Sequence, residues 1–257
     1  MLTGRQKQHF HEQGYVVVHG AVPRLMVEAA RQAVNHSVGS VGVREENSSQ
    51  YRPAAMCDEL RSLPVMTDLF NRSTVMGVAE SMIGEGNVQR VGGVQIALRW
   101  PGPVGSDPGE PRGHLDGLGS GTNGTPKGEY RRGFTALAVI YLGDVPAPYS
   151  GNFTVWPRSH TFFREHFLEH GHGVLADGMP RADLPEPPLQ ITGEAGDLVL
   201  AHHQTVHTAA PNGSANVRYA AISRLRHVDT EVNGPEVYTD IWREYPGLRA
   251  EFEEDAA

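Results

Sequence analysis

The run LQITGEAGDLVLAHHQTVHTAAPNGSANVRYAAISRLR, residues 189–226, decides the fold class. Its apolar segments are short, and turn-forming residues separate them. We expect strands at about 189–192, 196–201 and 204–209, and a longer strand over 217–226. The turn before the last strand is supplied by Pro211-Asn212-Gly213. Short strands interrupted by turns favour a sandwich or an open barrel over a parallel sheet.

The strand-rich pattern extends upstream to residue 87, whereas the first third of the chain is mostly helical. Thr3 and Gln6 have the spacing of a capping box, so a helix is expected from Gly4, and Gly14 is placed to end it. The further elements that we expect are strands at 15–19, 88–100, 134–142 and 153–156, and helices at 23–36, 64–70, 74–83, 159–170 and 238–244. The segments 39–56, 101–132 and 171–188 are expected to be loops.

These elements predict a mainly β structure with additional helices, a jelly-roll barrel braced by N-terminal helices. We expect one domain over residues 1–257. Within it, residues 1–86 are mostly helical support, residues 87–230 form the jelly-roll core, and residues 231–257 form a C-terminal helix and an acidic tail.

Composition narrows the classes of function. The formal net charge of −8 argues against non-specific nucleic-acid binding, and no run of 18 apolar residues predicts a membrane span. The N-terminus is polar from its third residue, so we expect no signal peptide. The single cysteine, Cys57, cannot form an intramolecular disulfide, which favours a cytoplasmic location. The oligomeric state is not readable from the sequence.

The segment His114-Leu115-Asp116 is a candidate for metal binding. Residues two apart in an extended segment point to the same side, so the histidine and the carboxylate can reach one ion. His207 lies on a predicted strand that could return beside them. Two histidines and one carboxylate leave coordination positions open for iron(II) oxygenase chemistry, although a zinc hydrolase can use the same ligands. His203 could lie on the same face as His207 and support it.

Arg218 distinguishes the iron(II) oxygenase from the zinc hydrolase. It follows His207 by 11 residues, with a turn between them, so the next antiparallel strand can return it toward the metal. An arginine there can hold a carboxylate through two parallel hydrogen bonds. 2-Oxoglutarate requires this arrangement, because one end of the molecule chelates iron and the distal carboxylate needs a cation.

The sequence resembles the phytanoyl-CoA dioxygenase family of iron(II)/2-oxoglutarate-dependent oxygenases. The resemblance rests on four stretches in the expected order. They are Leu2-Thr3…Phe10…Gly14-Tyr15-Val16-Val17-Val18, His114-Leu115-Asp116-Gly117, Gly151-Asn152-Phe153-Thr154-Val155-Trp156-Pro157-Arg158-Ser159-His160, and Gly196-Asp197-Leu198-Val199-Leu200…His207…Asn212-Gly213-Ser214…Arg218.

The resemblance implies a cupin-like double-stranded β-helix, with His114, Asp116 and His207 binding Fe(II) and Arg218 anchoring 2-oxoglutarate. It also implies O2 as a substrate and the release of succinate and CO2. Because family halogenases replace the aspartate, Asp116 favours hydroxylation of an unactivated C–H bond. Gln95 is a further candidate for contact with the co-substrate or substrate.

Two positions depart from the family pattern. Arg158 stands where glycine is frequent. Ala209 stands where a small hydroxyl residue is frequent, so Thr208 or Thr205 would have to replace that contact with the co-substrate.

Two other classes of function stay open at this stage: a non-oxidative metalloenzyme (hydrolase or isomerase) on a cupin-like barrel, and a non-catalytic binding protein. The first does not explain Arg218, and the intact set of four residues argues against the second. We expect the substrate to be a small-molecule metabolite or a secondary-metabolite intermediate. A basic cluster, Lys127, Arg131 and Arg132, could attract an anionic substrate or could simply be solvated.

Overall fold

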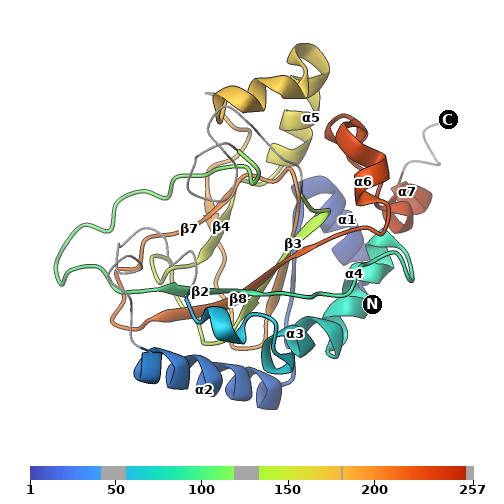
Figure 1. The fold of residues 1–257 in the computed structure, drawn as a ribbon. Coiled ribbons are helices and arrows are strands. Elements are labelled where there is room, and N and C mark those ends of the chain that lie inside the picture. Colours follow the sequence, from blue (N-terminus) through green and yellow to red (C-terminus); the bar gives the residue numbers. More distant parts are fainter. Residues whose placement is uncertain (42–55, 119–132, 181, 253–257) are drawn as a thin grey trace.

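The computed structural model describes residues 1–41, 56–118, 133–180 and 182–252. The basic cluster predicted from Lys127, Arg131 and Arg132 lies outside the described residues. Two antiparallel sheets form the jelly-roll barrel that the sequence predicted (Figure 1). The larger sheet has the order β1-β6-β3-β8-β2, with β1 Tyr15–Val18, β2 Gln95–Arg99, β3 Ala136–Tyr141, β6 Leu198–His202 and β8 Arg218–Leu225. The smaller sheet has the order β5-β4-β7, with β4 Phe153–Val155, β5 Leu189–Gln190 and β7 His207–Ala209.

The larger sheet is covered on both faces. All six residues of β3 are buried, which explains why its sequence is continuously apolar instead of alternating. Leu137, Val139 and Tyr141 pack in the barrel interior, whereas the residues between them pack on the outer face against the helices. The Tyr141 hydroxyl crosses the interior, where it donates to the Ile191 carbonyl and accepts from the Phe153 backbone N–H. This side chain therefore links the larger sheet to the smaller one.

Helices brace the outer face of the larger sheet, as predicted (Figure 1). The capping box at Thr3 and Gln6 is present, and Gly14 ends the first helix in a left-handed conformation. The long α2 helix runs beneath the sheet and packs against α3. The helices are α1 Gly4–Gln13, α2 Arg24–Val41, α3 Pro64–Asn71, α4 Thr74–Ile83, α5 Ser159–His170, α6 Thr230–Asn233 and α7 Pro246–Phe252, and the 3-10 helices are η2 Asp58–Leu60, η3 His172–Asp177 and η4 Gly234–Tyr238. In the described part of the chain, no helix has the length and apolar character needed to cross a bilayer.

Three local predictions need correction. The helix expected over 238–244 is wrong, because helical structure occupies Gly234–Tyr238 and Pro246–Phe252 with turns between them. Proline favours the first position of a helix and disfavours helical geometry in the residue before it, so Pro246 starts a new helix. The strand expected over 88–100 is regular only from Gln95 to Arg99. The loop expected over 171–188 contains the η3 helix.

Candidate metal centre

Backbone pairing holds His114 beside His207. Each residue donates its N–H to the carbonyl of the other at 3.0 Å, as an isolated antiparallel bridge. Directly paired residues in an antiparallel ladder project their side chains to the same side. The segment before His114 reaches this position only because Gly113 has no side chain. A Cβ there would lie 2.5 Å from Val206 Cγ1 and 2.7 Å from Trp156 Cζ3.

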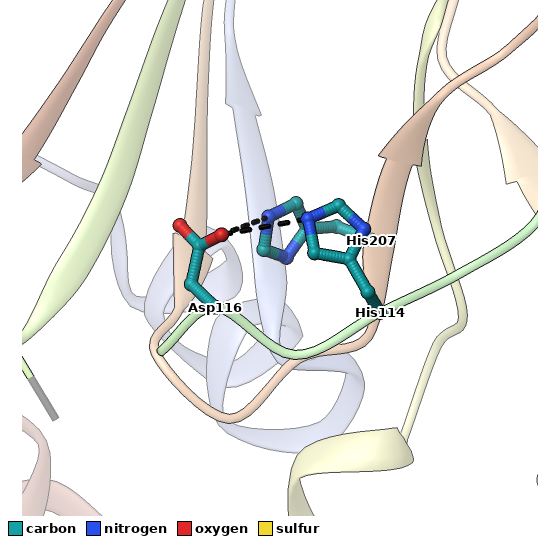
Figure 2. A group of neighbouring side chains, drawn as sticks. All are labelled: His114, Asp116 and His207. Carbon is teal, nitrogen blue, oxygen red and sulfur yellow. Dashed lines mark ion pairs between the residues drawn. The ribbon is translucent and has the colours of Figure 1, made fainter. Parts of the chain in front are cut away.

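Asp116 completes a group of three potential ligands (Figure 2). Its Oδ1 lies 3.4 Å from His114 Nε2 and 3.8 Å from His207 Nε2. One potential ligand atom from each residue lies within 4.8 Å of the others. Neighbouring ligands around an octahedral ion with bonds of about 2.1 Å lie about 3 Å apart. Two imidazole nitrogens and one carboxylate oxygen at this spacing fit an iron(II) ion with three positions left open.

A hydrogen bond behind His207 sets its tautomer. Nδ1 lies 3.0 Å from the Thr205 carbonyl oxygen, which can only accept, so Nδ1 carries the proton. The Nε2 lone pair is then directed toward Asp116 and is available to a metal. Burial lowers the pKa of His207 to about 4, although the Asp116 charge opposes this shift. The imidazole is therefore neutral at pH 7, as a metal ligand must be.

Arg224 holds the other oxygen of Asp116. Its Nε and Nη2 lie 2.8 Å and 2.7 Å from Oδ2, which leaves Oδ1 to face the histidines. Burial disfavours ionisation of Asp116, but the hydrogen bond from His114 and the positive charge of Arg224 oppose this effect, and the pKa of the carboxyl lies below its ordinary value. Arg224 was not among the site residues predicted from the sequence. The available signal was its position six residues after Arg218 on one strand, because residues an even number apart share a face.

Arg218 is buried at the start of β8, on the face of the sheet that lines the barrel. Nε donates to the Gly151 carbonyl at 2.7 Å, and Nη1 donates to the Ala97 carbonyl at 2.9 Å. Burial lowers its pKa to about 10, so the guanidinium remains charged at pH 7. No carboxylate of the described residues forms an ion pair with Arg218. A buried cation without a counter-ion is costly, so this position is suited to an anion from outside the chain.

The remaining predicted site residues occupy different places. Gln95 lies beside the centre, where its Oε1 accepts a hydrogen bond from Arg224 Nη1 at 3.0 Å. Thr208 pairs with Thr154 in the smaller sheet, and its side chain projects to the face opposite His207 because neighbouring strand residues alternate. His203 lies in the turn after β6 and is not part of the ligand group.

Comparison with protein families provides the identification. The model of the phytanoyl-CoA dioxygenase family matches residues 10–220. The chain belongs to the phytanoyl-CoA dioxygenase family. It is therefore a 2-oxoglutarate-dependent dioxygenase, and the cofactors of this class are iron and 2-oxoglutarate, as the sequence predicted. The match includes the three ligand candidates and Arg218, whereas Arg224 lies beyond it. No curated protein matches the chain.

Solved structures with the same fold include non-heme 2-oxoglutarate-dependent enzymes and HygX, which binds 2-oxoglutarate. The 2-oxoglutarate-dependent carbocyclase SnoK from nogalamycin biosynthesis has 21% identity and a TM-score of 0.59, with 90% of each chain covered. The epimerase SnoN of the same biosynthesis has 20% identity and a TM-score of 0.58, with 87% of this chain and 81% of SnoN covered. HygX from Streptomyces hygroscopicus, with nickel and 2-oxoglutarate bound, has 16% identity and a TM-score of 0.56, with 89% and 88% covered. These likenesses confirm the double-stranded β-helix.

Proposed function

We propose that this dioxygenase binds iron(II) through His114, Asp116 and His207, anchors 2-oxoglutarate on Arg218, and hydroxylates an unactivated C–H bond of a small-molecule metabolite. The observation that carries the proposal is the charged, buried Arg218 without a carboxylate partner among the described residues, in the barrel that also holds the ligand group. A hydrolase with the same ligands would have no need for this cation.

Each side chain has a defined task in this proposal. The iron centre, when bound with 2-oxoglutarate and O2, supplies the oxidation and releases succinate and CO2. His207 presents Nε2 because Thr205 holds the proton on Nδ1. Asp116 stays ionised and presents Oδ1 because Arg224 holds Oδ2. Arg218 pairs with the distal carboxylate of 2-oxoglutarate, and the apolar barrel interior keeps water from this ion pair.

A small-molecule substrate is supported by the relatives of known structure. SnoN was solved with nogalamycin RO and HygX with hygromycin B. The relatives also include a carbocyclase and an epimerase, so C–H oxidation on this fold can have outcomes other than hydroxylation. We also propose a cytoplasmic location, which rests on the single cysteine, Cys57.

The test is an anaerobic titration of the metal-free protein with iron(II) and 2-oxoglutarate. We expect a weak visible charge-transfer band that requires both, and succinate formation once O2 is admitted. Asp116→Ala and His207→Ala should abolish the band. Arg218→Ala should weaken 2-oxoglutarate binding by roughly 2–5 kcal/mol, by comparison with truncated buried charge pairs. His36→Ala, an exposed histidine on α2, is the matched control and should behave as the wild type. Iron binding without any band would remove 2-oxoglutarate from the proposal.

A further inference from the structure

The segment that leads into the edge strand β2 bulges away from the segment that follows β8. Gln89 donates its backbone N–H to the Arg226 carbonyl, and regular pairing resumes at Gln95 and Ile222. Between these two pairings the chain advances by six residues from Gln89 to Gln95, but the opposite segment spans only four residues, from Arg226 to Ile222. The extra residues form a bulge, and bulges are frequent beside active sites.

A cavity of about 340 Å³ lies at this bulge. Gly92 and Gly93 line it, and a Cβ added to either glycine would meet no atom within 4 Å. Neither glycine has a positive φ, so the backbone does not require glycine at these positions. A larger side chain at either position therefore has open space available beside the cavity. Its volume lies at the lower end of the range for small-molecule sites, about 300–1,000 Å³.

The cavity carries a concentration of positive charge in an acidic chain. No aspartate or glutamate is among the residues that line it. Arg90 makes no ion pair with any residue that the structure describes. Arg61 and Arg226 have exposed carboxylate neighbours, at 3.3 Å from Asp58 and 3.6 Å from Glu231. Exposed pairs of this kind contribute little, so an entering anion can compete for both arginines. The lining arginines are Arg61, Arg90, Arg224 and Arg226.

Two side chains connect the cavity to the metal centre. Arg224 and Gln95 both line the cavity, and Arg224 is bonded to Asp116. A group held in the cavity is therefore beside a residue that is bonded to a candidate metal ligand. Arg218 lies six residues away on the same strand and the same face. Arg218, at the start of β8, is thus available for 2-oxoglutarate. The arginine cluster around Arg224, near the end of β8, is available for another molecule.

We propose that this cavity binds the anionic group, a carboxylate or a phosphate, of the substrate that the enzyme oxidises. This proposal rests on the proposed function, because it assumes that the enzyme oxidises a small-molecule substrate. Binding of the anion to the cavity can nevertheless be measured without turnover. Arginine suits both groups because its planar guanidinium can donate two parallel hydrogen bonds to either of them. A neutral molecule of the same shape would leave the arginine cluster unpaired.

The experiment measures binding of three probes of similar shape by calorimetry: benzoate, phenyl phosphate and neutral benzamide. The protein is loaded anaerobically with iron(II) and saturating 2-oxoglutarate, so that Arg218 is already occupied. The charge-transfer band reports this loading separately. We expect at least one anion to bind and benzamide not to bind. The stronger of the two anions identifies the substrate group as carboxylate or phosphate.

Variants locate the binding. Gly93→Leu fills the cavity and should abolish anion binding, and Arg90→Gln should weaken it about tenfold through loss of charge-assisted hydrogen bonds. Arg72→Gln, an exposed arginine outside the cavity, should leave it unchanged. Should Gly93→Leu fail to fold, Arg90→Gln still decides. Equal binding of benzamide, no anion binding, or full binding in both cavity variants would overturn the proposal. If the charge-transfer band is absent but the anion still binds to the wild type and not to Gly93→Leu, the result would count against the proposed function alone.

Discussion

Arg224 offers the sharpest test of how the metal centre is held. Arg224→Gln keeps a hydrogen-bonding side chain but removes the charge and both short contacts to Asp116 Oδ2, at 2.8 Å and 2.7 Å. The carboxylate then loses the group that fixes its orientation and keeps it ionised. Loss of a partner behind a metal ligand typically costs 10–100-fold in affinity. The Arg224 side chain is 42% exposed, and solvent weakens exposed ion pairs. We therefore expect a loss of iron affinity at the lower end of this range, about tenfold or 1.4 kcal/mol.

The assay is an anaerobic competition for iron(II) against a chromogenic chelator, with the free energy of unfolding measured in parallel. Arg243→Gln is the matched control. Arg243 is 39% exposed and pairs with Glu236 at 2.7 Å, away from the centre. Both variants should lose a similar, small amount of stability, but only Arg224→Gln should lose iron affinity. Saturating iron should restore most of its succinate formation. Equal iron affinity in Arg224→Gln and the wild type would refute the reasoning, as would an equal loss in Arg243→Gln.

Three further predictions concern the barrel around the centre. The metal-free protein should lose stability as the pH falls from about 6.5 to about 4. Burial lowers the pKa of His160 and His207 to about 4, so the unfolded chain binds protons in this window that the folded protein does not, at up to about 1.4 kcal/mol per pH unit for each group. Urea unfolding at pH 7, 6 and 5 measures this, and a flat profile would contradict it. Gly113→Ala should weaken iron binding and cost about 1–3 kcal/mol of stability through overpacking. Gly143→Ala, which meets open space, should do neither in the same chelator and unfolding assays. Tyr141→Phe should cost about 1–3 kcal/mol in urea unfolding, because it leaves the buried Phe153 backbone N–H without an acceptor, whereas the Ile191 carbonyl keeps its hydrogen bond from Asn152. An unchanged midpoint would show that the Phe153 N–H finds another partner.

The sequence alone was sufficient for the elements whose signals are local. The capping box at Thr3 and Gln6 predicted the start of α1, and the apolar run 134–142 predicted β3, because both patterns depend on neighbours within a few residues. The spacing of His114 and Asp116 likewise predicted two neighbouring ligands, although Asp116 begins a turn and does not continue an extended segment. The helix predicted over 238–244 was wrong, because an apolar pattern with helical spacing does not by itself show where a helix begins and ends. The structure places the helices at Gly234–Tyr238 and Pro246–Phe252.

Tertiary structure alone decided how these local pieces meet. The pairing of His114 with His207 joins segments 93 residues apart, and the contact of Arg224 with Asp116 joins segments 108 residues apart. The arginine-lined cavity depends on the two-residue excess of one strand over its neighbour, which appears only when both are aligned. Residue types and spacing encode which side of a strand a group occupies. The register between distant strands depends on how the whole barrel packs, and this register selects the arginine that faces the aspartate.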